Sequence, residues 1–350
     1  MNMPPTPNLP LTNTASDFAP AASYRDRSTG LTIFGTIQIL LGGFCALMCP
    51  LVLFGLMMSR KVSGISEPIA GQFLGVLWYA LMAAIFITLG IGSIQARRWA
   101  HALSLILSYI WLIGGSLVVV LLTAIMPIAI KTALHQAGGK EMPAAFMAVI
   151  LTVGIAFAAL FLIALPIAFL VFYGKHDVRE TCRQRDPVER WTDHCPLPVL
   201  AMSLLFAFTA FYYLAMGVAK PLLPFFGIYL SGIPGTIAFL LLAPLEVYFS
   251  RAFFQLKPTG WWIAVFTRGL LFISAVITAT RSSLMDAYVK MGMSSRELQQ
   301  LNSNPLAHSK AILFFGLSFS LIFFGYLLWL KKYFKNPNAG QEPSYNAVIA

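Results

Sequence analysis

The feature that most constrains this chain is a series of apolar runs of 20 or more residues. A helix of about 20 apolar residues crosses a hydrocarbon core of about 30 Å. The runs are continuously apolar rather than alternating, which indicates membrane-spanning helices and not the strands of a barrel. The sequence therefore predicts an all-α integral membrane protein with about eight transmembrane helices. They are expected at residues 31–58, 72–95, 99–127, 144–173, 197–219, 236–256, 261–279 and 311–330.

The charge content supports this class and bears on possible partners. Only 11% of the residues are charged, whereas soluble globular proteins carry about 25%. The net charge of +11 comes from lysines and arginines in short loops between the apolar runs, where basic residues orient a membrane protein. No basic face with interleaved stacking aromatics is present, so we expect a lipid bilayer and no nucleic acid as partner.

Three pairs of segments resemble each other at a spacing of about 160 residues. "QARRWAHALSL" and "QLKPTGWWIAV" are the clearest pair, and both are basic turns followed by tryptophan. "EPIAGQFLG" pairs with "SGIPGTIAF", and "FLVFYGKHDV" pairs with "LLWLKKYFKN". Four crossings return the chain to its starting side, so the spacing predicts two tandem parallel repeats. The expected domains are a tail (1–30), the first repeat (31–173), a charged loop (174–196), the second repeat (197–335) and a second tail (336–350), with both tails disordered.

Lysine and arginine counts predict the orientation. The side that holds both termini and the loops near residues 97, 185 and 257 carries 14 of these residues, and the opposite side carries 9. Basic residues favour the cytoplasm, so we expect both termini there, in a bacterial inner membrane. The longest connection on the opposite side, residues 280–310, contains Ser294 and Glu297 at the spacing of a helix capping box.

Two opposite charges, Glu246 and Arg268, lie inside the sixth and seventh spans. Glu246 is ten residues before Leu256 and Arg268 is seven after Trp261, which places them roughly 15 Å and 11 Å below the turn between the two helices. Neighbouring antiparallel helices bring such residues together. Two interpretations remain open, because a buried pair can fix helix packing or can form a substrate or proton site.

The first repeat contains no such pair. Apolar residues around Leu105 and Ile106 occupy the place equivalent to Arg268. Any role of the charged pair is therefore expected in the second repeat alone.

Two groups of possible metal or redox ligands occur. One is a pair of cysteines four residues apart in the first span, which share a helical face. The other falls within twenty residues of the charged loop, but its spacing does not match common zinc patterns. We favour buried thiols and a solvated loop, and expect no cofactor. The residues concerned are Cys45, Cys49, His176, Cys182, His194 and Cys195.

Aromatic and small residues predict contacts with lipid and between helices. Trp99, Trp261 and Trp262 follow the two basic turns, as interfacial anchors do, and His101 is expected to face the headgroups beside them. Gly71 and Gly75 form a GxxxG pattern, which lets helices approach closely.

The sequence leaves the function open among three classes. No Walker A, dinucleotide-binding, HExxH or nucleophile-elbow motif is present, so an intramembrane enzyme is the least favoured. A small secondary transporter that uses Glu246 and Arg268 is the alternative. We favour a non-enzymatic accessory or scaffold component, bound to a membrane-protein partner or to further copies of itself.

Overall fold

The computed structural model describes residues 24–63, 69–136, 144–219, 221–293, 298–299 and 310–335. Within these residues, eight helices are long and apolar enough to cross a membrane, which confirms the predicted spans. They are α1 (Ser28–Ser63), α2 (Ile69–Ile94), α3 (Arg98–Gln136), α4 (Ala144–Ala159) continued by a π-helical turn (Leu160–Ala164) and α5 (Leu165–Tyr173), α7 (Leu197–Ala219), α8 (Gly232–Phe254), α9 (Pro258–Arg281) and α12 (Lys310–Trp329).

Shorter elements lie at the two ends of the spans. The predicted charged loop is largely ordered, with α6 (His176–Arg185) and a 3₁₀ turn (Trp191–Asp193). The other elements are α10 (Leu284–Lys290), α13 (Lys331–Lys335) and two strands, β1 (Leu222–Phe225) and β2 (Ile228–Ser231). The strands form an antiparallel hairpin that the sequence did not predict. The predicted capping box at Ser294 and Glu297 lies outside the described residues.

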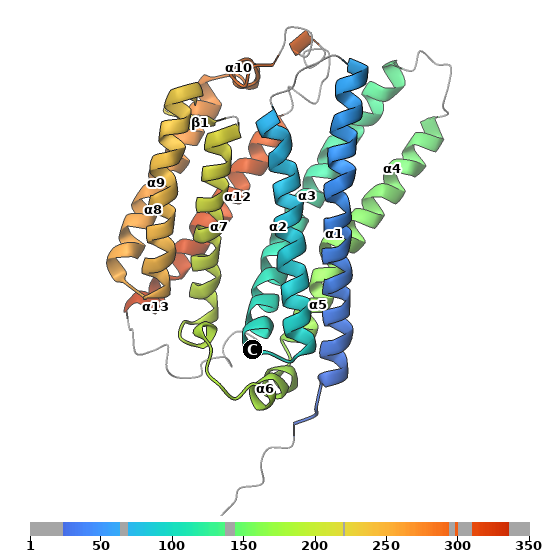
Figure 1. Cartoon of the computed structure of the whole chain (residues 1–350). Helices are drawn as coiled ribbons and strands as arrows, with labels where there is room; N and C mark the ends of the chain where they lie inside the picture. Colours follow the sequence, from blue (N-terminus) through green and yellow to red (C-terminus); the bar gives the residue numbers. More distant parts are fainter. Residues whose placement is uncertain are drawn as a thin grey trace, which may run out of the picture.

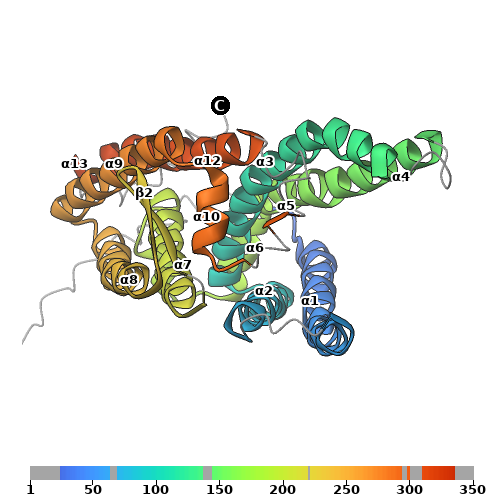
Figure 2. The same ribbon diagram turned by 90° about the horizontal axis from the view of Figure 1, so that it is seen from above.

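The spans form two side-by-side groups (Figures 1 and 2). The first group is α1 to α5, and the second is α7, α8, α9 and α12. Between the groups, α2 and α3 contact α7, and α3 also contacts α12. Figure 1 places α6 and α13 at one end of the helices and the hairpin and α10 at the other.

Each group has its own buried apolar cluster. The first gathers residues of α1, α3, α5 and α6, including Leu31, Phe169 and Cys182. The second gathers residues of α7, α8, α9, α12 and α13 together with Ile106 of α3, and Phe206 and Phe253 are among its fully buried members. Many other apolar side chains of the spans are exposed, as expected of surfaces that face lipid.

Small residues allow α1 and α2 to pack closely. A Cβ atom added at Gly35 would lie 2.8 Å from the carbonyl oxygen of Gly90, and one added at Gly42 would lie 3.0 Å from that of Ala83. The two contacts are seven residues apart on each helix, so they lie on one face two turns apart. No heavy atom of the described residues lies within 4 Å of a Cβ added at Gly75, so the predicted GxxxG pattern makes no close helix contact within this part of the chain.

The α2–α3 and α8–α9 turns share one geometry. Ala96 and Leu256, 160 positions apart, both have a positive φ, 51° and 52°. In the first turn the N–H of Ala96 donates to Ser93 and that of Arg97 to Gly92. In the second, the N–H of Leu256 donates to Phe253 and that of Lys257 to Ala252. This is the Schellman pattern of helix C-termini, formed here around a non-glycine residue.

The hairpin turn is held by one face of α9. Its two residues, Phe226 (φ 43°) and Gly227 (φ 103°), both have positive φ, and the N–H groups of both donate to hydroxyl oxygens of α9. Phe226 donates to Ser274 (2.9 Å) and Gly227 to Thr278 (3.0 Å), while the hydroxyl of Ser282, just beyond α9, donates to the carbonyl of Gly227 (2.5 Å). The three hydroxyls recur every four residues, a spacing that places them on one face.

Candidate functional site: a buried ion pair in the second helix group

The charged pair inside the second helix group is formed in the structure. Arg268 on α9 donates to a carboxylate oxygen of Glu246 on α8. The Glu246 side chain is 0% exposed and that of Arg268 is 14% exposed. Both lie roughly 12–15 Å from the α8–α9 turn, at 1.5 Å per residue. The two helices thus bring together charges that would each be costly alone in the hydrocarbon core.

Aromatic side chains from the other two helices close around Arg268. Nη1 of Arg268 donates to the hydroxyl of Tyr213 on α7, at 3.3 Å. The guanidinium carbon lies 5.4 Å from the ring centre of Phe206 on α7 and 5.1 Å from that of Phe323 on α12. Cation–π attraction adds stabilisation when the cation is desolvated. All four spans of the second group therefore contribute to the site.

Two polar atoms of the pair have no hydrogen-bond partner among the described residues. They are Oε1 of Glu246 and Nε of Arg268, and both are buried. Oε1 is an acceptor and Nε a donor, and both are enclosed by protein. Within the described residues, these two atoms are the ones of the pair that make no hydrogen bond.

The first helix group has no ion pair at the equivalent place. Phe86 and Ser108 lie 160 positions before Glu246 and Arg268, the same separation as between Ala96 and Leu256. Phe86 packs against Trp111 with ring centres 5.5 Å apart. Ser108 donates its hydroxyl to the carbonyl of Ser104 on its own helix. The first helix group therefore packs at these two positions without charged side chains.

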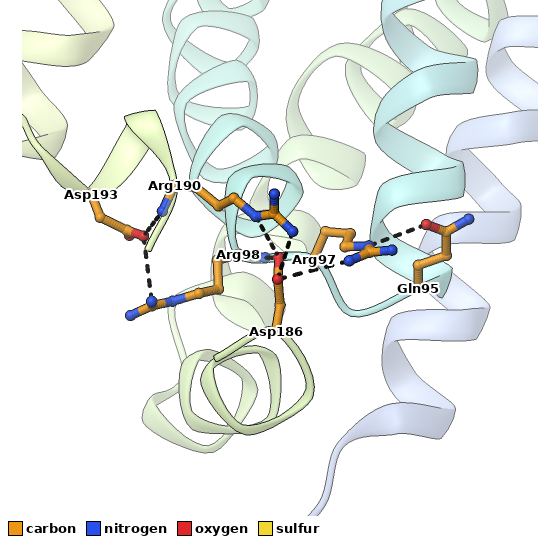
Figure 3. A network of polar contacts seen from close by, with 6 residues as sticks. All are labelled: Gln95, Arg97, Arg98, Asp186, Arg190 and Asp193. Atoms are coloured by element: carbon orange, nitrogen blue, oxygen red, sulfur yellow. Dashed lines mark hydrogen bonds and ion pairs between the residues drawn. The ribbon is translucent and has the colours of Figure 1, made fainter. Parts of the chain in front are cut away.

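A second polar network joins the α2–α3 turn to the segment that follows α6 (Figure 3). Asp186, whose side chain is 2% exposed, accepts from Nε and Nη2 of Arg190 at 3.1 and 2.8 Å and pairs with Arg97 at 3.8 Å. Arg98 pairs with Asp193 at 3.6 Å. Hydrogen bonds from the Arg190 side chain, then one from the backbone N–H of Arg98, then the charges of Arg190 and Arg97 lower the pKa of Asp186 below its usual 3.8. The network therefore attaches the segment that follows α6 to the α2–α3 turn.

Asp186→Asn is expected to lower the free energy of unfolding by about 1–3 kcal/mol at neutral pH, because charge-assisted bonds are lost. A depressed pKa in the folded state means that the carboxylate stabilises the fold above pH 3.8. This stabilisation is lost as the pH falls through the folded-state pKa. Melting curves in detergent at neutral pH and below pH 3.8 test the difference. Glu189→Gln, an exposed acid of the same loop, is the control; an equal loss in both variants contradicts the role of Asp186.

The cysteines do not come together as ligands. Cys49 donates weakly to the carbonyls of Cys45 and Val76 at 3.6 and 3.8 Å, within and beside α1. Cys182 and Cys195 are buried in two different clusters. Burial raises the pKa of both thiols to about 12, which disfavours the thiolate that binds metal or reacts.

The two histidines of the loop, His176 and His194, are exposed. The described residues contain no group of three or more His, Cys, Asp or Glu side chains that could hold a metal ion. The structure therefore gives the predicted ligand group no common centre. The four side chains are close in sequence, but the fold of the loop exposes the two histidines and buries the two cysteines in different clusters.

Two predicted interfacial residues lie in the interior instead. Trp261 is 3% exposed, and its Nε1 donates to the carbonyl of Leu327 at 2.9 Å. His101 is buried, with Nε2 2.8 Å from the carbonyl of Tyr173. Both attach the start of one span to the backbone of another. Trp262 is 59% exposed, as an interfacial anchor is expected to be, and Trp99 is half-buried.

The chain matches no family model, no curated protein and no solved structure. Its function is therefore argued from the geometry of its own residues.

Proposed function

We propose that this protein is a non-enzymatic component of the membrane, an accessory subunit or scaffold that holds a partner protein. The observation that carries the proposal is the enclosure of the Glu246–Arg268 pair. The carboxylate is fully buried, and the guanidinium is covered by the carboxylate, Tyr213 and two phenyl rings. Such a pair joins four helices and presents little charge to a transported ligand.

The hairpin supports the part of the proposal that concerns a partner. Phe225, Phe226 and Ile228 are exposed at its tip, although the turn beneath them is fixed by three hydroxyl groups. Backbone held at unusual φ by surrounding contacts is found at functional sites. Aromatic residues, phenylalanine among them, are also enriched at protein interfaces.

Site-specific photo-crosslinking tests this proposal. A photoreactive amino acid at Phe225 is expected to give one discrete protein adduct in native membranes, lost when Phe226 and Ile228 are replaced by serine. The matched control is the same amino acid at Val218, which is exposed on the span α7, and it is expected to label lipid. Identical products from both positions, or no protein adduct at Phe225, would contradict a partner at the hairpin.

We also propose that the two helix groups are tandem parallel repeats, 31–173 and 197–335. The shared Schellman turns support this, as does a reciprocal contact across them: an added Cβ at Gly92 meets Ala100, and one at Gly260 meets Ala252. These four residues correspond at the spacing of 160. The excess of basic residues on the side of α6 and α13 supports cytoplasmic termini, in a bacterial inner membrane.

A small secondary transporter is the second candidate. The free Oε1 of Glu246 and Nε of Arg268 favour it, because they could bond to a small ligand or to a water molecule that carries a proton. Intramembrane ionisable residues mark such paths in transporters. Proton-coupled uptake that Glu246→Gln abolishes without unfolding the protein would establish this candidate in place of the scaffold.

A further inference from the structure

Among the residues whose side chains the structure describes, four basic ones lie at the end of the second helix group near α13. Arg251 is in the last turn of α8, Lys257 precedes α9, and Lys331 and Lys332 begin α13. Figure 1 shows α13 beside the lower ends of α8 and α9, and α13 contacts α9. We call these four residues the lysine surface.

Aromatic rings hold the two lysines of α13. Nζ of Lys331 lies 5.5 Å from the ring centre of Trp261 and 5.1 Å from that of Trp262. Nζ of Lys332 lies 3.9 Å from the ring centre of Trp329. A ring attracts an ammonium group but accepts none of its protons as a carboxylate would. Each ammonium thus keeps N–H groups that can donate to an anion.

No carboxylate neutralises the lysine surface among the described residues. None of its four members belongs to an ion pair there. Between residues 197 and 335 the sequence contains three acids: Glu246, Asp286 and Glu297. Glu246 is buried in the core of the group, Asp286 lies in α10 at the opposite end (Figure 1), and Glu297 is outside the described residues.

The same end of the first helix group is different. There Asp186 pairs with Arg97 and Arg190, and Asp193 pairs with Arg98 (Figure 3). Further ion pairs join Arg27 to Asp177 and Arg185 to Asp26. The second group keeps an unneutralised cationic surface at the level of its exposed tryptophans.

We propose that the lysine surface is a binding site for the headgroups of anionic phospholipids. Trp262 and Trp329 are exposed beside the lysines, and tryptophan rings lie at the headgroup level of a bilayer. The ammonium groups therefore meet phosphate at the depth where lipid supplies it. Lysine binds phosphate as a compact charge, and each basic residue near an anionic surface strengthens binding by about fivefold.

Native mass spectrometry of the purified full chain tests this proposal. Dioleoylphosphatidylglycerol and dioleoylphosphatidylcholine are titrated separately in mild detergent. We expect the anionic lipid to bind at least about tenfold more tightly. Lys331→Gln/Lys332→Gln is expected to remove most of that preference, and Lys331→Arg/Lys332→Arg to retain it. The matched control, Arg281→Gln/Lys290→Gln, removes two charges at the opposite end and is expected to leave the preference unchanged.

Three results would overturn the proposal. The first is equal affinity of the wild type for the two lipids. The second is an unchanged preference in Lys331→Gln/Lys332→Gln, or in Lys332→Glu if the double variant does not fold. The third is displacement of the lipid by inorganic phosphate at millimolar concentration, which would show a site for free phosphate rather than for a lipid headgroup.

Discussion

Arg268→Gln is expected to lower the free energy of unfolding by about 3–5 kcal/mol, because it leaves the carboxylate of Glu246 buried without its partner. Glu246→Gln leaves the guanidinium with Tyr213 and two phenyl rings, so a smaller loss is expected. The double variant is expected to recover much of the loss. Replacing both members of a buried pair removes two desolvated charges together.

Thermal melting of the four proteins in one detergent gives the coupling between the two residues. A coupling energy of about 1–3 kcal/mol is expected for residues in direct contact. Equal melting temperatures in all four proteins would show that the fold does not need the pair. The scaffold proposal would then lose its main support, and proton and substrate uptake would be measured next.

Gly35→Ala is expected to destabilise the protein by about 1–3 kcal/mol, because a Cβ there meets the backbone of α2 and helices cannot yield as a side chain does. Gly43→Ala, on the same helix, is the matched control. Among the described residues, no heavy atom lies within 4 Å of a Cβ added at Gly43. Alanine has less backbone freedom than glycine in the unfolded state, so Gly43→Ala is expected to stabilise the helix by up to about 1 kcal/mol.

Melting temperature and the yield of folded protein after size exclusion measure both glycine variants. Opposite signs for Gly35→Ala and Gly43→Ala are the expected result. A loss of similar size in both would mean that glycine matters for the helix itself and not for the contact between α1 and α2.

Depth in the membrane could be predicted from the sequence, since it depends on the length of each apolar run. The same counting placed Glu246 and Arg268 at similar heights. It could not give the direction in which a side chain points about the helix axis. For this reason Trp261 and His101, although next to the turns, were wrongly expected to face the headgroups.

Contacts across long sequence separations could not be predicted. The hairpin follows a span and reads as apolar chain, and its turn depends on hydroxyls of Ser274 and Thr278 about fifty residues later. Their four-residue spacing with Ser282 is the signal that could have indicated a polar face on α9. Phe206, Tyr213 and Phe323 carry no comparable signal, because aromatic residues recur along every span.

The charged loop illustrates a different limit. Its composition indicates a solvated segment, and several of its side chains are exposed. Val178 and Cys182 nevertheless pack into the first cluster, and Asp186 is enclosed by arginines. Composition averages over such a segment, whereas α6 separates its buried face from its exposed one.

The way in which the two helix groups meet has a consequence for their symmetry. The first group uses its second and third spans, α2 and α3, and the second uses its first and fourth, α7 and α12. Each group thus presents a different face, which makes the contact heterologous rather than isologous. If the two groups were related by a twofold axis, as in a symmetric dimer, they would contact each other through the same face. The two groups instead stand side by side in a head-to-tail arrangement. The two lateral edges that the molecule presents in the bilayer are therefore not equivalent.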